Sequence, residues 1–375
     1  MSSKRGNGEG SITRRKDGRW MARYTVHTVN GPKRKHIYGK TRQEVAEKLS
    51  KAVSDRVGGL VFDGDHETLG AYLERWIDEA VRGTVKQSTL ENYAYVVRRH
   101  ITPALGHMRL RDVKSRDVRR LYREKLDAGL SPRTVQLIHT VLRRALQQAV
   151  RDDVLPRNIC DAVTAPRRAK KEMRPLTPEQ AKRLLTGVRG DRLEALYVLA
   201  VTAGLREGEL LGLRWDDIDL ERRVLQVRRQ LTRTRDGLSF SEPKRGKARV
   251  VRLAGAAVAA LEGHWAAQNG ERTKAGSMWR ETGLVFTSTV GTPTDVGNLT
   301  YRSFRPLLER ADLPRIRFHD LRHTCATLLL SRGTHPKIVQ EMLGHANIAM
   351  TMDTYSHVLP DMQEKAVNAM DDVLT

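Results

Sequence analysis

Apolar residues recur at helical spacing through the middle of the chain, and helix-starting residues precede them. The amphipathic segments cover residues 68–81, 113–130 and 133–154. Ser88 with Glu91 has the pattern of a capping box for one further helix, and Ser131 followed by a proline starts the last one. We therefore predict an all-α domain over residues 65–165.

Three short β-prone runs occupy the N-terminal part of the chain. They are separated by the turn dipeptides Asp-Gly at 17–18 and Asn-Gly at 30–31, which favour hairpins. Thr41 with Glu44 then predicts the start of a helix. We expect residues 1–60 to form a three-stranded sheet plus a helix. This basic module could lie in a DNA groove, or it could be a solvated extension.

A basic stretch bounded by Pro166 and Pro175 predicts a linker over residues 166–175, followed by a last domain over 176–375. The apolar run Ala195–Leu205 is too short to span a bilayer and predicts a buried helix. β-prone runs around the Asp-Gly pair at 236–237 add a small antiparallel sheet. We expect a mostly helical last domain that ends in an amphipathic helix, and a multidomain α+β chain.

The charge balance narrows the choice of partner. The 375 residues carry 67 Lys and Arg against 44 Asp and Glu, a formal net charge of +23. This excess favours double-stranded DNA, because the basic residues are spread along the chain and are not gathered on one membrane-binding helix. Two cysteines give no disulfide framework, and the start has no apolar signal core. We expect a cytoplasmic protein with no membrane partner.

Candidate chemistry gathers between Arg317 and His357. His319 and Arg322 stand three apart in a helical pattern, so we expect them to share the polar face opposite the apolar one. A second helix ends at a glycine directly before His345, and Tyr355 follows. A guanidinium, two imidazoles and a phenol are suited to gripping a phosphate and attacking it.

Each candidate also has a structural interpretation. Arg206, directly after the apolar run, could form a surface ion pair with Glu209, and Lys244 in a basic turn could only touch a DNA phosphate. Tyr355 could be a packing residue.

His319 and His323 have the spacing of helical zinc ligands. However, Asp320 stands where the glutamate of a zinc-hydrolase motif would be, and no third ligand is nearby. We therefore expect no metal.

Four motifs in order give the chain a family resemblance. TAGLREGEL contains Arg206, HDLRH contains His319 and Arg322, LGH ends in His345, and DTYSHV contains Tyr355. With Lys244 between the first two, the chain resembles a tyrosine recombinase of the phage and mobile-element integrase type. The resemblance implies an arm-binding domain over 1–60, a core-binding domain over 65–165 and a catalytic domain over 176–375.

The resemblance implies a role for each residue. Arg206 and Arg322 would hold the non-bridging oxygens of a DNA phosphate, with Glu209 supporting the site. Tyr355 would attack the phosphorus; its hydroxyl has a reference pKa of about 10 and must lose its proton.

The other residues would move protons. His319 would accept the tyrosine proton, His345 would hydrogen-bond a non-bridging oxygen, and Lys244 would protonate the departing 5′ oxygen. No cofactor is required. The resemblance further implies a homotetramer on attachment-site DNA that passes through a four-way junction. An excisionase or other directionality factor and a DNA-bending host protein are further candidate partners.

Basic residues outside the motifs are candidate DNA contacts. They are Arg14, Arg15, Lys16, Arg19, Lys33, Arg34, Lys35, Arg98, Arg99, Arg143, Arg144, Arg167, Arg168, Lys170 and Lys171. A non-enzymatic helix-turn-helix regulator and a type IB topoisomerase are the rival functions. The regulator would form no covalent adduct, and the topoisomerase would relax supercoils as a monomer. A serine recombinase would attach DNA through a different residue.

Overall fold

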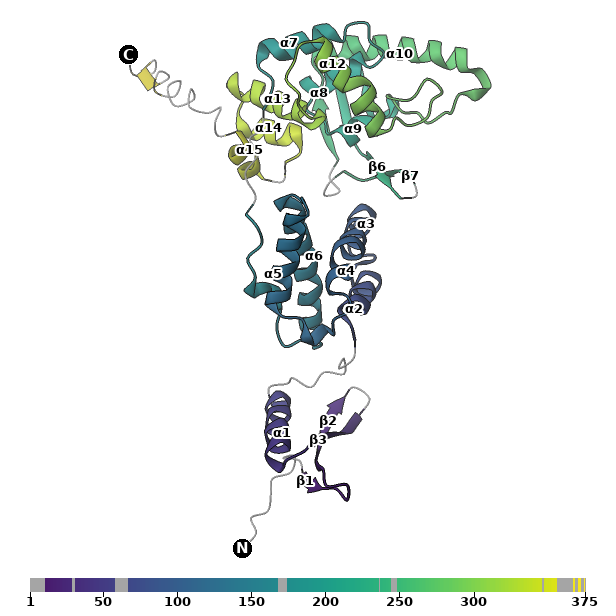
Figure 1. Ribbon diagram of the computed structural model, residues 1–375. Helices are drawn as coiled ribbons and strands as arrows, with labels where there is room; N and C mark the ends of the chain where they lie inside the picture. Colours follow the sequence, from purple (N-terminus) through teal and green to yellow (C-terminus); the bar gives the residue numbers. More distant parts are fainter. Residues whose placement is uncertain are drawn as a thin grey trace. The chain divides into compact units, whose positions relative to one another are not determined.

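The computed structural model of the protein is shown in Figure 1. The structure describes residues 11–28, 31–57, 67–167, 174–235, 237–243, 248–345, 347–355, 367, 370, 371 and 374. The chain divides into two compact units, residues 1–170 and 171–375. The predicted α+β class is confirmed, because helices predominate and the small sheets are antiparallel.

The N-terminal module is a sheet with one helix packed on it. Strands β1 (Ser11–Arg14), β2 (Trp20–Thr28) and β3 (Gly31–Gly39) pair antiparallel in chain order, and α1 (Arg42–Val57) covers β2. Ala22 from β2 packs with Val45 and Leu49 from α1. The Glu44 N–H donates to Thr41 Oγ1 at 3.1 Å. The predicted three-stranded sheet and capped helix are both present.

The second part of the first unit is a helical bundle (Figure 1). Its elements are α2 (Leu69–Trp76), the π-helical turn η1 (Ile77–Val81), α3 (Gln87–Val96), the π-helical turn η2 (Val97–Ile101), α4 (Thr102–Leu105), η3 (Leu110–Asp112), α5 (Ser115–Asp127), α6 (Pro132–Arg151) and η4 (Ile159–Ala162). Ser131 Oγ caps α6 by accepting from the Thr134 N–H at 3.2 Å. The predicted Ser88 cap is wrong, because α3 already begins at Gln87 and Lys86 takes its N-cap position.

The second unit carries the remaining elements (Figure 1). They are α7 (Pro178–Gly187), α8 (Glu194–Thr202), α9 (Glu207–Leu211), η5 (Trp215–Asp217), β4 (Ile218–Asp219), β5 (Val224–Val227), β6 (Gln230–Thr234), β7 (Gly237–Ser241), β8 (Arg249–Arg252), α10 (Gly255–Ala275), η6 (Gly276–Met278), α11 (Val296–Asn298), η7 (Leu299–Phe304), α12 (Arg305–Arg310), α13 (Phe318–Ser331), α14 (Pro336–Leu343) and α15 (Ile348–Tyr355). Most of the predicted C-terminal helix lies outside the described residues.

The predicted β-prone run after Arg223 belongs to two sheets. Strands β4, β5 and β8 form one sheet, whereas β6 and β7 form a separate hairpin. The break falls at Arg228 and Arg229, whose guanidinium nitrogens lie 3.6 and 2.5 Å from the carboxylate of the buried Asp217. These ion pairs draw both arginine side chains toward one carboxylate. In a continuous strand, two successive side chains would point to opposite faces.

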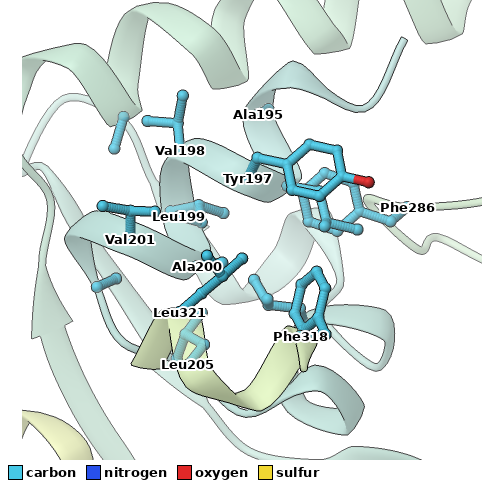
Figure 2. Packing of buried hydrophobic residues seen from close by; sticks show 14 of the residues in the cluster. Ala195, Tyr197, Val198, Leu199, Ala200, Val201, Leu205, Phe286, Phe318 and Leu321 are labelled. Carbon is cyan, nitrogen blue, oxygen red and sulfur yellow. The ribbon is translucent and has the colours of Figure 1, made fainter. Parts of the chain in front are cut away.

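Helix α8 runs through the core of the second unit, as the apolar run predicted. Tyr197 is fully buried and its hydroxyl lies 2.6 Å from Ser303 Oγ. Figure 2 shows Phe318 and Leu321 of α13 directed at α8. This packing fixes the helix that carries His319 and Arg322. Among the described residues, no helix has the length and apolar character needed to cross a membrane.

Candidate active site

Arg206 follows a tight turn that only glycine can make. Gly204 has a φ of +60°, and a Cβ there would lie 2.5 Å from Leu343 Cδ2 and 3.2 Å from Cys325 Sγ. Arg206 then takes the N-cap position of α9, with its N–H donating to Glu209 Oε2 at 2.9 Å. Its Nη2 donates to the Gly344 carbonyl at 3.3 Å, so α9 delivers the guanidinium to the end of α14.

Glu209 lies between two guanidinium groups and is 1% exposed. Its Oε1 accepts from Arg206 Nη1 at 2.7 Å, and both carboxylate oxygens accept from Arg249, at 3.0 and 2.7 Å. Burial opposes ionisation, but the Arg249 hydrogen bonds and the charges of Arg249 and Arg206 hold the pKa of Glu209 at about 2. Glu209 is therefore a carboxylate throughout the physiological range.

Arg322 is only 2% exposed, so the prediction that it lies on a polar face opposite the apolar one is wrong. Its Nη1 donates to the Gly204 carbonyl at 2.7 Å, and its Nη2 donates to the Leu343 carbonyl at 2.5 Å. Backbone carbonyls compensate for the lost hydration of the guanidinium, which explains how an arginine can occupy an interior position.

The two arginines, far apart in sequence, meet at consecutive carbonyls. Arg206 donates to the carbonyl of Gly344 and Arg322 to that of Leu343. The helix end that precedes His345 therefore holds both guanidinium groups in one place.

His345 follows the left-handed Gly344 (φ +65°) that ends α14. Its Nδ1 lies 2.9 Å from the hydroxyl of Thr351, a fully buried residue of α15. Burial, followed by the charges of Arg322 and Arg206, lowers the pKa of His345 to about 3. The imidazole is therefore neutral at pH 7, and Thr351 fixes its ring orientation, while Nε2 has no hydrogen-bond partner among the described residues.

His319 and His323 stand edge to face on α13, with ring centroids 5.1 Å apart. Desolvation by the surrounding protein, followed by the charges of Arg322 and Arg317, lowers the pKa of His319. Burial and then His319 lower the pKa of His323 to about 4. Around them, within the described residues, no cluster of three or more His, Cys, Asp or Glu side chains could hold a metal ion.

Of two further predicted catalytic residues, the structure describes only the backbone of Tyr355 and no part of Lys244. Tyr355 is the last residue of α15, one helical turn after Thr351. Helix α15 packs on α14, so the backbone at Tyr355 belongs to the same substructure as His345. The side chain of Tyr355 and the whole of Lys244 lie outside the described residues.

The structure adds Arg249 and Thr351, which sequence reasoning did not assign. Arg249 carried a readable signal. It stands two residues before the buried Val251 in a strand, so the two share a face, and an arginine on an inward face requires a buried partner. Thr351 carried no comparable signal, because a hydroxyl in a helix has many local partners.

Two of the four predicted DNA contacts in the helical bundle line a hollow of about 730 Å³ between η1 and α6. Arg143 and Arg144 lie along it, Arg143 paired with Asp161 at 2.8 Å and Arg144 donating to the Tyr93 hydroxyl at 3.1 Å. Arg98 also has a carboxylate partner, Glu74, at 2.7 Å, and Arg99 is exposed. These arginines face solvent, but three of them have partners within the bundle.

The predicted DNA contacts in the N-terminal module lie around the β1–β2 turn and on β3. The exposed ones are Arg14, Arg15, Lys16, Arg19 and Arg34. Arg15 also lies over the Tyr38 ring, 5.4 Å from its centroid. Lys35 is half-buried, and the side chain of Lys33 is outside the described residues. In the linker, Arg167 is exposed, whereas Arg168, Lys170 and Lys171 fall outside the described residues.

Comparisons with known proteins agree with this geometry. The phage integrase family matches residues 174–362, and the N-terminal SAM-like domain of phage integrases matches residues 68–126. A tyrosine recombinase XerC-like protein of Caldanaerobacter subterraneus subsp. tengcongensis is 32% identical over 360 residues, which cover 91% of this chain and 92% of the relative.

Two solved structures share the fold. The Tn1549 transposon integrase in complex with a circular intermediate DNA has 26% identity and a TM-score of 0.68, covering 81% of this chain and 99% of that chain. A lambda integrase tetramer bound to a Holliday junction has 19% identity and a TM-score of 0.58, covering 90% and 95%. With Arg206, Arg322 and the His345 turn brought together at the end of α14 and similarity along most of its length, the chain belongs to the phage integrase family of tyrosine recombinases.

Proposed function

We propose that this tyrosine recombinase cleaves and rejoins double-stranded DNA at attachment sites through a 3′-phosphotyrosyl intermediate on Tyr355, and so integrates or excises a phage or mobile element. The observation that carries the proposal is the meeting of Arg206 and Arg322 at the consecutive carbonyls of Gly344 and Leu343. Two fixed guanidinium groups beside neutral imidazoles form a site for one phosphodiester.

The charge of the site supports phosphate binding. Three guanidinium groups gather here, and only one carboxylate, Glu209, lies among them, bonded to Arg206 and Arg249, while Arg322 is bonded to backbone carbonyls. Burial, together with this local excess of positive charge, lowers the pKa of His345 and keeps it neutral in the free protein. A bound phosphodiester would offset that excess, and the guanidinium groups would stabilise the additional negative charge of the transition state.

The proton transfers follow from the imidazoles. His319 is unprotonated at pH 7 and accepts the Tyr355 proton during attack. His345, with Nδ1 held by Thr351, presents Nε2–H to a non-bridging oxygen. Lys244 protonates the departing 5′ oxygen. The phosphotyrosine ester preserves the energy of the broken bond, so rejoining needs no cofactor.

The remaining parts of the chain bind DNA and assemble the complex. Residues 1–60 bind arm sequences, residues 65–165 bind the core site, residues 166–175 are a basic linker, and residues 176–375 form the catalytic domain. Four protomers act on two duplexes through a Holliday junction, in keeping with the lambda integrase tetramer. The protein acts in the bacterial cytoplasm, with an excisionase or other directionality factor and a DNA-bending host protein as accessory partners.

A covalent trap tests the proposal. DNA that carries the site and a nick next to the cleavage position should accumulate a covalent adduct with the wild-type protein. Tyr355→Phe should form none, because it lacks the attacking oxygen, and should still bind the DNA. Binding without any adduct in the wild type would favour the helix-turn-helix regulator, and an undiminished adduct in the variant would exclude Tyr355 as nucleophile.

Lys244 has its own test. In Lys244→Ala, cleavage of ordinary DNA should fall, and a 5′ sulfur leaving group should restore it, because a thiolate departs without a proton. No restoration would assign the acid to another residue.

Removal of residues 1–57 tests the N-terminal module. The shortened chain should lose affinity for distal arm sequences and retain cleavage at the crossover site. Equal loss of both would contradict a separate arm-binding role.

A further inference from the structure

Arg249 is a largely buried cation of β8 whose side chain contacts both halves of the active site. We infer that Arg249 is a positioning residue, which holds the Arg206 turn and the His345 turn in register for attack on the phosphate. This inference rests on the proposed function. Arg249 lies outside the four sequence motifs that carry the family resemblance.

Each of the three guanidinium nitrogens of Arg249 donates a hydrogen bond. Nη1 and Nη2 donate to the two oxygens of Glu209, at 3.0 and 2.7 Å, and Nε donates to the Met342 carbonyl at 2.9 Å. The side chain is 11% exposed. Such a planar fork fixes both partners in one plane, which the single ammonium of a lysine could not do.

The contact with Glu209 reaches Arg206 directly. Each carboxylate oxygen accepts from both arginines: Oε1 from Arg206 Nη1 at 2.7 Å, and Oε2 from the Arg206 N–H at 2.9 Å, besides the two bonds from Arg249. Glu209 therefore has little freedom to rotate while Arg249 is present. Since Glu209 holds both ends of Arg206, Arg249 sets the direction of the phosphate-binding guanidinium through it.

The contact with α14 reaches His345. Met342 lies in the last turn of α14, and Gly344 packs against the Arg249 side chain so closely that a Cβ at Gly344 would lie 3.1 Å from Arg249 Cδ. The turn that presents His345 and accepts hydrogen bonds from Arg206 and Arg322 therefore rests on Arg249. The charge of Arg249 also contributes to the lowered pKa of His345.

The same strand supplies a matched control. Arg252 is three residues further along β8 and is exposed. Arg252→Ala removes the same charge from the same strand without touching Glu209 or α14.

The experiment separates binding from cleavage with nicked site DNA under single-turnover conditions. Arg249→Ala should bind DNA within about threefold of wild type and cleave bound DNA about a hundredfold more slowly. Arg249→Lys, which keeps the charge and protects against misfolding, should cleave about tenfold more slowly. Arg252→Ala should cleave like wild type. Wild-type cleavage rates in Arg249→Lys and Arg249→Ala would overturn the inference.

A double-mutant cycle with Glu209→Gln identifies the route. If Arg249 acts through Glu209, the double variant should be no slower than the slower single variant. Multiplying effects would overturn positioning of Arg206 through Glu209. Rescue of Arg249→Ala by a 5′ sulfur leaving group would also overturn it, and would assign the loss to protonation of the leaving group. Wild-type protein serves as the separate test of function, because absence of its adduct would refute the recombinase mechanism itself.

Discussion

Two sets of arginines in this protein differ in how the fold holds them. Arg206, Arg249 and Arg322 are bound to carbonyls and one buried carboxylate, with their direction fixed before any ligand arrives. Arg143 and Arg144 in the helical bundle are exposed at the surface of a hollow. Fixed cations can stabilise a transition state, whereas exposed cations contribute attraction that salt screens.

The largest expected effect is at Arg322. Arg322→Lys should reduce cleavage of bound DNA about a thousandfold, because one ammonium cannot donate to the Gly204 and Leu343 carbonyls and also face a phosphate. The same exchange at Arg144 should leave cleavage of bound DNA unchanged. Single-turnover rates measure both. Equal losses at the two positions would erase the distinction between the two sets.

Glu209→Gln should have the next largest effect. A neutral amide leaves two partly buried guanidinium groups without a counter-charge, so we expect cleavage to fall about a hundredfold and the free energy of unfolding to fall by about 3 kcal/mol. Urea denaturation and single-turnover cleavage test the two parts. Unchanged stability would show that the arginines do not need the carboxylate.

Burial of His345, together with the fixed arginines beside it, should also make the second unit acid-sensitive. The folded-state pKa of His345 is about 3, below its ordinary value of 6.5. Between these values only the unfolded chain binds the proton, so stability falls as the pH falls from about 6.5 toward 3. In His345→Gln, the free energy of unfolding should therefore fall by about 1–2 kcal/mol less between pH 7 and pH 5 than in the wild type. His139→Asn, in the hollow of the helical bundle, should change this pH dependence less than His345→Gln does. A larger change in His139→Asn would contradict the expected difference between the active site and the bundle.

The smallest effects are expected at the exposed arginines. Arg143→Ala and Arg144→Ala should each weaken DNA binding about two- to threefold at moderate salt and reduce the slope of log affinity against log salt by about 1, as for loss of one phosphate contact. Cleavage of bound DNA should not change. Binding titrations over a salt series measure the slope, and an unchanged slope would remove these residues from the DNA contacts.

Local patterns predicted most of the fold. The cap at Thr41, the proline after Ser131 and the glycine at position 344 each mark a helix end where the structure has one, because such signals depend on neighbouring residues alone. The Ser88 cap failed because the helix begins two residues before the predicted start, with Lys86 at the N-cap position.

The site was less accessible to sequence reasoning. Periodicity placed Arg322 on a polar face, because a helical pattern cannot reveal that carbonyls from two other segments receive its guanidinium. Sequence reasoning did not assign Arg249, whose partner Glu209 is 40 positions earlier in the chain. Long-range pairing of polar groups is a property of the folded chain and has no local signature.

Helix α15 carries both Tyr355, the proposed nucleophile, and Thr351, whose hydrogen bond orients His345. In the proposed mechanism, any displacement of α15 withdraws the attacking oxygen and at the same time frees the ring that would steady the phosphate. A protomer with α15 out of place is thus doubly disabled, and a complex of several copies can keep some of its active sites silent by moving a single short segment.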